Sequence, residues 1–176
     1  MKAADRTQVF MTMAYIAALA SKDEHTKIGS VLVGPDNEIR STGYNGFPRG
    51  CCDDFIYRQE KPEKYYWMSH SEVNSIFNAA RTGIPTKSCT LYTMAYPCAD
   101  CARAIIQAGI TKVVIHKRFS DLMNPENWKE SFLRAQEMFD ETHIEVVLWE
   151  GKLLNPTPFC NGEEVTYRRE LKINWR

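Results

Sequence analysis

The chain has 176 residues, and its 22 Lys and Arg balance its 22 Asp and Glu. This length suits one domain with a sizeable core, so we expect a single domain over 1–176 with a C-terminal tail at 151–176. The neutral balance argues against a nucleic-acid partner, and no apolar run is long enough to cross a membrane. The chain has six Cys and no recognisable signal peptide, which favours free thiols or a metal site over disulfide bonds. We therefore expect a cytoplasmic protein, in the cytoplasm of the host if the chain is viral.

The N-terminal part predicts a helix followed by a hairpin. Apolar side chains recur at helical spacing over 5–21. Residues 28–34 and 38–44 flank a Pro-Asp-Asn turn and predict two antiparallel strands. Glycines and a proline over 43–54 exclude regular structure there, and long loops of this kind tend to be functional. The stretch 55–68 is charged and aromatic, and its aromatic side chains could stack on a base or pack at an interface.

The rest of the chain alternates helices with strands. Helical patterns cover 70–82, 98–108 and 126–139, and strand patterns cover 89–94, 112–116 and 144–149. The order α-β-β-α-β-α-β-α-β predicts an α/β fold, a three-layer α-β-α sandwich around a five-stranded mixed sheet. Both the second and the third helix follow a loop that leaves the sheet, so their N-termini can converge.

Two short motifs carry the chemistry. His70 and Glu72 form an H-x-E motif, and Pro97 precedes Cys98 and Cys101 in a P-C-x-x-C motif. Imidazole and thiolate ligands suit zinc, and three of them leave the fourth position open for water, as in catalytic sites. Cysteines three residues apart on a helical turn point the same way, and a helix N-terminus favours their thiolates. A carboxylate beside such a metal can carry protons, so we expect Glu72 to act as general base and then as general acid.

A structural zinc site or a metal-free thiol pair is the alternative interpretation of these motifs. Structural sites normally have four ligands. Another His, or one of the remaining cysteines, could supply the fourth: Cys51, Cys52, Cys89 or Cys160. Because the two motifs alone leave a structural site one ligand short, we favour the catalytic interpretation.

The motifs, with a Gly-Tyr-Asn-Gly block at 43–46, make the chain resemble the deoxycytidylate deaminases of the cytidine and deoxycytidylate deaminase superfamily. H-x-E with P-C-x-x-C is the general signature of zinc deaminases, and the block at 43–46 with its long following loop points to the deoxycytidylate branch. The resemblance covers roughly 5–150. It implies a cytidine deaminase-like fold and the hydrolytic deamination of dCMP to dUMP and ammonia, which supplies the precursor of dTTP.

The resemblance also implies roles for single residues. It places one zinc ion on His70, Cys98 and Cys101, makes Glu72 the proton shuttle, and puts Asn45 near the 3′-hydroxyl of the sugar. Some relatives carry a second, structural zinc, but the chain lacks the extra cysteine that this site uses.

Two positions depart from the family pattern near the substrate. Ser71 replaces the usual alanine, and Phe119 stands where the family often has a tyrosine that helps to hold the phosphate. Four residues are possible substitutes for that tyrosine, and the sequence does not decide among them: Lys27, His25, Lys117 and Arg118.

Family members are commonly homo-hexamers, activated by dCTP and inhibited by dTTP, with Mg²⁺ on the effector triphosphate. The resemblance therefore implies an effector or coupling region made of Tyr44, Gly46, Arg49, Asp53 and Arg81. Two other functions stay open: a superfamily deaminase acting on a nucleoside, dCTP, guanine or a tRNA base, and a zinc-stabilised nucleotide-binding module without turnover.

Overall fold

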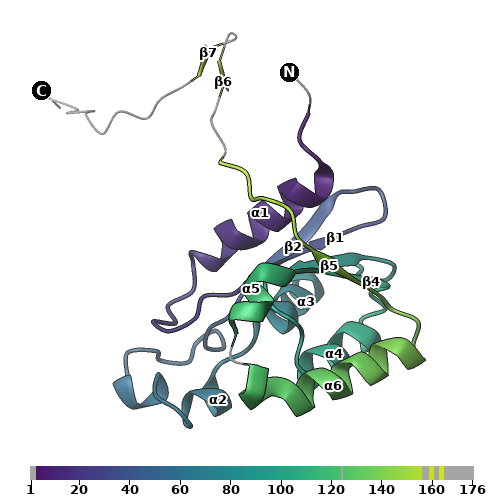
Figure 1. Ribbon diagram of the computed structural model, residues 1–176. Coiled ribbons are helices and arrows are strands. Elements are labelled where there is room, and N and C mark those ends of the chain that lie inside the picture. The colour runs from purple at the N-terminus through teal and green to yellow at the C-terminus, as the bar shows by residue number, and fades with distance from the viewer. Residues whose placement is uncertain (1–2, 124, 156–158, 161–162, 165–176) are drawn as a thin grey trace, which may run out of the picture.

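The strands expected from the sequence form one five-stranded sheet in the order β2-β1-β3-β4-β5 (Figure 1). The computed structural model describes residues 3–123, 125–155, 159–160 and 163–164. β1 pairs antiparallel with β2 and β3, whereas β3, β4 and β5 run parallel, so the sheet is mixed as predicted. The five strands are β1 (Gly29–Val33), β2 (Ile39–Tyr44), β3 (Thr90–Thr93), β4 (Lys112–His116) and β5 (Glu145–Trp149).

Helices cover both faces of this sheet, which confirms the three-layer arrangement (Figure 1). One face packs against the first long helix and the other against the remaining three: α1 (Arg6–Ala18), α3 (Ser71–Arg81), α4 (Ala99–Gln107) and α6 (Pro125–Glu141). Shorter elements lie between and after them: η1 (Ile56–Arg58), α2 (Lys64–Trp67), α5 (Lys117–Leu122) and the strand pair β6 (Phe159–Cys160) and β7 (Glu163–Glu164).

The core consists of two apolar clusters, one on each face of the sheet. Successive side chains of a strand point to opposite faces. In β3, Leu91 therefore joins the cluster under α3, α4 and α6, while Tyr92 joins the cluster under α1. Val113 and Val114 of β4 divide in the same way. Each face of the sheet thus has its own buried packing.

The close contact between β2 and α3 depends on Gly43. A Cβ atom at this position would lie 2.1 Å from the carbonyl oxygen of Ser71 and 2.4 Å from the backbone nitrogen of Ser75. The Ser71 carbonyl also accepts a hydrogen bond of 2.8 Å from the Ser30 hydroxyl on β1. These contacts hold the first turn of α3 directly against the sheet.

Three details differ from the sequence expectations. The helix expected from residue 70 begins at Ser71, and His70 is its N-cap because the backbone of His70 is still extended. The short helix α5, which contains Phe119, follows β4 without a break and was not predicted. Most of the tail expected at 151–176 lies outside the described residues, although the backbone N–H of Leu154 donates to Thr12 on α1.

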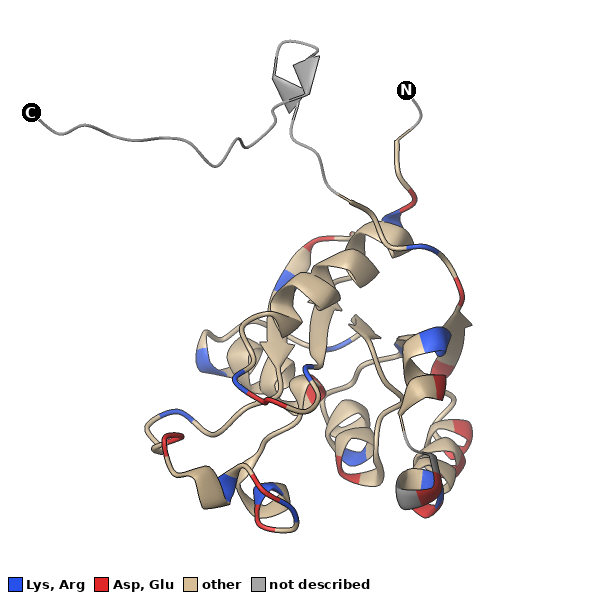
Figure 2. Ribbon diagram, turned by 60° about the vertical axis from the view of Figure 1, so that its left-hand side comes forward, with Lys and Arg blue, Asp and Glu red and all other residues tan. Residues whose placement is uncertain are grey.

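Charges of both signs are interspersed along the ribbon in Figure 2, as the neutral composition suggested. In the described part of the chain, no helix has the length and apolar character needed to cross a membrane.

Candidate active site

The two sequence motifs meet where α3 and α4 begin. His70 is the N-cap of α3, and Cys98 is the N-cap of α4, which also carries Cys101 in its first turn. The Nδ1 atom of His70 lies 3.4 Å from the sulfur of each cysteine. A search of the described residues for His, Cys, Asp and Glu side chains close enough to share a metal ion finds this group of one His and two Cys.

The geometry of this triangle fits a tetrahedral zinc ion. Zinc bonds of about 2.0–2.1 Å to nitrogen and 2.3 Å to sulfur, at a tetrahedral angle, place the two ligand atoms about 3.5 Å apart. The observed separations of 3.4 Å match that spacing. His70, Cys98 and Cys101 are therefore arranged to hold zinc, and three protein ligands leave one position for a small molecule.

In the absence of a metal ion, the three side chains of the triangle differ in how readily they give up a proton. A hydrogen bond from Cys101, aided by His70, lowers the pKa of Cys98 to about 4. The hydrogen bond to Cys98 raises the pKa of His70 to about 9, and the bond to Cys98, together with burial, raises the pKa of Cys101. Cys98 is therefore favoured in the thiolate form that binds zinc, whereas His70 and Cys101 each release a proton when a metal ion binds.

Glu72 lies in the first turn of α3, beside the metal ligands, and is only 4 % exposed. The hydroxyl of Ser71 donates a hydrogen bond of 2.9 Å to its Oε2 atom. Burial raises the pKa of Glu72, and the nearby His70 opposes that rise. The hydroxyl of Ser71 is thus used to orient the carboxylate.

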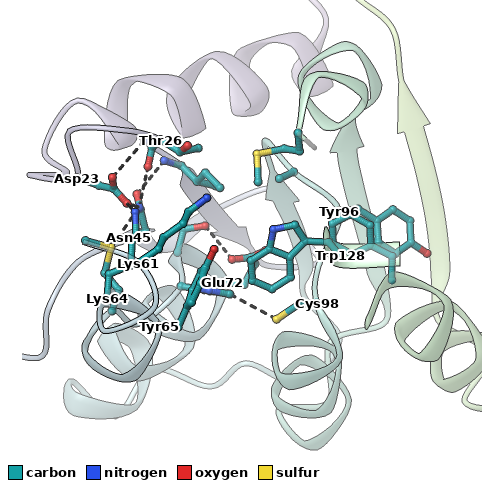
Figure 3. Close-up of a pocket in the computed structure, with 17 residues that line it drawn as sticks. Asp23, Thr26, Asn45, Lys61, Lys64, Tyr65, Glu72, Tyr96, Cys98 and Trp128 are labelled. Carbon is teal, nitrogen blue, oxygen red and sulfur yellow. Dashed lines mark hydrogen bonds and ion pairs between the residues drawn. The ribbon is translucent and has the colours of Figure 1, made fainter. Parts of the chain in front are cut away.

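A pocket opens over this group and brings together residues from five segments of the chain (Figure 3). Asn45 and Ser71, both expected at the substrate, line it. Lys27 and Phe119 are not among its lining residues: Lys27 is exposed, and Phe119 packs edge-on against Tyr15 at 5.9 Å between ring centres. The substrate roles of these two residues remain predictions.

The sequence did not indicate several residues that complete the pocket. A buried ion pair joins Asp23 to Lys64, with 2.8 Å between Oδ2 and Nζ. Aromatic rings form the opposite wall, where Trp128 lies 5.9 Å from His70 and 6.0 Å from Tyr65, measured between ring centres. Tyr65 was considered only as one of several aromatic residues that could stack on a base, and no local pattern marks Trp128 within its helix.

A second hollow lies beside the pocket, on the outer side of α3. Four of the five residues expected in an effector region line it: Tyr44, Gly46, Arg49 and Arg81. The fifth, Asp53, does not line it, but shares another hollow with Tyr44 and Gly46 and forms an exposed ion pair of 2.8 Å with Lys22. The effector roles of all five remain predictions.

Comparison with known proteins places this site in a family. Residues 4–117 match the model of the cytidine and deoxycytidylate deaminase zinc-binding region. Human deoxycytidylate deaminase is 38 % identical over 112 residues, which cover 61 % of this chain and 62 % of the human protein. The chain thus spans less than two thirds of that relative. The deoxycytidylate deaminase of Enterobacteria phage T4 is 30 % identical over an alignment covering 88 % of this chain and 98 % of the phage protein.

A solved structure shows the same fold. The dCMP deaminase from the cyanophage S-TIM5, crystallised in complex with dCMP and dUMP, superposes with a TM-score of 0.64 at 21 % identity, covering 85 % of this chain and 100 % of that one. The matched family region contains every ligand of the metal triangle together with Glu72. The chain belongs to the cytidine and deoxycytidylate deaminase family.

Proposed function

We propose that the protein is a zinc-dependent deaminase that converts dCMP and water into dUMP and ammonia. The observation that carries the proposal is the metal triangle of His70, Cys98 and Cys101 at the floor of a pocket that also holds the buried Glu72. The human and phage relatives are named deoxycytidylate deaminases, which supports dCMP as the substrate.

Zinc held by these three residues would lower the pKa of its bound water to about 7, so that this water becomes a nucleophile at neutral pH. Glu72 takes one proton from the attacking water and gives it to N3 of the cytosine ring as the oxygen adds to C4. It then takes the second proton from the new C4 hydroxyl and gives it to the amine, which leaves as ammonia while the C4 carbonyl forms. Ser71 orients Glu72 through the 2.9 Å hydrogen bond between its hydroxyl and Oε2. The aromatic wall formed by Trp128 and Tyr65 shields the base from bulk water.

The pocket also suggests how a nucleotide is held. In this proposal Asn45 contacts the sugar and Lys61 binds the 5′-phosphate, and both residues line the pocket. Of the lysines that line the pocket, Lys64 is paired with Asp23, whereas Lys61 is exposed and extends over the opening (Figure 3). Its ammonium lies 6.0 Å from the centre of the Tyr65 ring. Lys61 thus joins Lys27 as a candidate for the phosphate.

Regulation is proposed for the second hollow. Arg49 and Arg81 supply two positive charges there, which suits the triphosphate of dCTP or dTTP with Mg²⁺. The hollow is bounded by α3, whose first turn holds Glu72, so an effector could alter the metal site through that helix. We propose in addition that the protein forms a homo-hexamer in which this face lies at a contact between subunits.

The test is the fall in cytosine absorbance when the zinc-loaded protein is mixed with dCMP, repeated with deoxycytidine and with dCTP plus Mg²⁺ or dTTP. We expect turnover of dCMP, faster with dCTP and slower with dTTP. Lys61→Met should raise KM for dCMP about tenfold and leave deoxycytidine unaffected, because a lost charge-assisted hydrogen bond is worth about 1.5–3 kcal/mol.

The exposed Lys87 provides the matched control, since Lys87→Met removes a surface charge that does not line the pocket. An absence of dCMP turnover with one zinc ion per chain would contradict the proposal and direct the search to other deaminase substrates. Turnover that ignores dCTP and dTTP would contradict only the regulatory part.

A further inference from the structure

The amide of Asn45 has one hydrogen-bonding position left for a ligand. An asparagine side chain offers two hydrogens and two lone pairs. Its Nδ2 donates to Oδ2 of Asp23 at 3.1 Å and to the carbonyl of Thr26 at 2.8 Å, and its Oδ1 accepts from the backbone N–H of Ile28 at 2.8 Å. What remains is one lone pair on Oδ1. Nδ2 also lies 3.9 Å from the sulfur of Met68, and Asn45 lines the pocket, so the hydrogen-bonding capacity that its amide can still offer a ligand there is that of an acceptor.

This orientation is fixed by its surroundings. Turning the amide over would set Nδ2 against the N–H of Ile28 and Oδ1 against the carboxylate of Asp23, so donors would face donors and acceptors would face acceptors. Each such buried mismatch leaves polar groups unsatisfied, at a cost of about 1–3 kcal/mol. The negative charge of Asp23 is what makes the reversed orientation unfavourable.

Lys64 in turn holds Asp23. Its Nζ donates to Oδ2 of Asp23 at 2.8 Å, while Oδ1 accepts from the backbone N–H groups of His25 at 2.9 Å and Thr26 at 3.1 Å. The side chains of Lys64 and Asp23 are only 9 % and 3 % exposed. Burying two charges costs desolvation free energy, which the ion pair recovers only with good geometry and further hydrogen bonds. A buried pair is therefore weak evidence for stability, and a role in positioning its neighbours is the better explanation for it.

We propose that Asp23 and Lys64 are positioning residues that lock the amide of Asn45, so that Oδ1 selects a hydroxyl donor on the sugar of the bound nucleotide. The pair joins the loop before β1 to α2, across 41 residues of sequence, and both residues line the pocket with Asn45 (Figure 3). They act through Asn45 and not on the reacting atoms. The inference rests on the proposed function, because it takes the ligand of this pocket to be a cytosine nucleotide.

The experiment compares two nucleotides that differ in one donor, dCMP and 2′,3′-dideoxy-CMP. In the wild-type protein we expect kcat/KM to be about tenfold or more higher for dCMP, the value of one well-placed hydrogen bond. The double variant Asp23→Asn with Lys64→Met should bring this ratio close to one, as should Asn45→Ala. The double variant leaves no unpaired buried charge, so it should fold where either single variant could fail.

Binding gives a second readout that does not require turnover. Calorimetry with dUMP and 2′,3′-dideoxy-UMP should show the same preference in the wild-type protein and its loss in the double variant. The matched control is Lys112→Met with Glu145→Gln, which removes an ion pair of similar length, 2.9 Å, that is exposed and distant from the pocket. This control should keep the wild-type ratio.

If kcat/KM fell by the same factor for dCMP and 2′,3′-dideoxy-CMP in the double variant, the ratio of the two values would be unchanged. That result would overturn the inference and leave Asp23 and Lys64 with a structural role. A wild-type protein that deaminates both nucleotides equally would overturn it as well, while the proposed deamination stood. A protein that binds both uridine nucleotides but deaminates neither cytidine nucleotide would overturn the proposed function. The ratio of the affinities for dUMP and 2′,3′-dideoxy-UMP would then still test whether Asp23 and Lys64 orient Asn45.

Discussion

Glu72 is the residue at which we expect chemistry and metal binding to be separable by mutation. Its carboxylate is buried next to the ligand triangle without belonging to it. Glu72→Gln keeps the size of the side chain but removes its ability to exchange protons. We expect kcat to fall by about 10²–10⁴-fold, the usual contribution of a general acid–base, while one zinc ion per chain is retained.

Turnover and metal content, measured on the same preparation, check this expectation. Glu145→Gln makes the same chemical change at an exposed position on β5 and should alter neither quantity. Near-normal turnover in Glu72→Gln would show that another group carries the proton.

Asp23 makes the stability of the protein depend on pH. Burial by itself would raise the pKa of Asp23, but hydrogen bonds from Lys64 and from the backbone N–H groups of His25 and Thr26 together hold it below its usual 3.8. A carboxyl group with a depressed pKa in the folded state adds stability above its unfolded pKa, and this contribution is lost as the pH falls through the folded pKa. The double variant Asp23→Asn with Lys64→Met lacks this titration and leaves no unpaired buried charge, so the wild-type advantage over it in free energy of unfolding should be constant from about pH 7 to 5 and shrink below about pH 4.

Denaturant titrations of both proteins across that pH range test the expectation. Loss of zinc in acid affects both proteins alike, so their difference reports on Asp23. The exposed Asp36, in the turn between β1 and β2, supplies the control Asp36→Asn, for which the difference should stay small throughout. A wild-type advantage that grows below pH 4 would contradict the assignment.

At the scale of elements, the contact of β2 with α3 determines where the metal site lies. Gly43→Ala would force a Cβ atom to within 2.1 Å and 2.4 Å of backbone atoms in the first turns of α3. Overpacking of this kind costs about 1–3 kcal/mol. Because the metal ligand His70 is the N-cap of the displaced helix, we expect lower zinc affinity in addition to lower stability.

Gly46→Ala is the matched control, since its new Cβ atom would meet nothing nearer than the Tyr44 ring at 3.8 Å. Denaturant unfolding and a zinc competition titration measure the two effects. Unchanged stability in Gly43→Ala would mean that β2 and α3 can separate without loss.

Elements with a local signal could be predicted from the sequence. Apolar spacing and turn residues indicated all five strands of the sheet and the four long helices, and the two zinc motifs lay within single helix starts. The pocket wall could not be predicted in the same way. Asp23 and Lys64 meet across 41 residues, and Trp128 reaches His70 only because α6 packs against α4. A sequence pattern records neighbours along the chain, whereas such contacts depend on how the layers stack.

At the scale of the whole molecule, the metal site lies outside the two apolar clusters that hold the layers together. Neither cluster includes His70, Cys98 or Cys101, and each consists of residues of the sheet and of the helices on one of its faces. Small zinc-dependent folds differ, because the metal there replaces a core that the chain is too short to form. Here the sheet and helices have a core of their own, so the metal ion is not needed to define the fold.

We therefore expect removal of zinc by a chelator to abolish deamination while the far-UV circular dichroism stays close to that of the zinc-loaded protein. The melting temperature should fall, because the two thiols and the imidazole lose a shared ligand, but unfolding should remain cooperative. Added zinc should restore activity, whereas Cys101→Ala, which lacks a ligand, should not recover. Loss of the cooperative transition on chelation would instead identify the ion as structural, and the open position of the triangle would then require a fourth protein ligand.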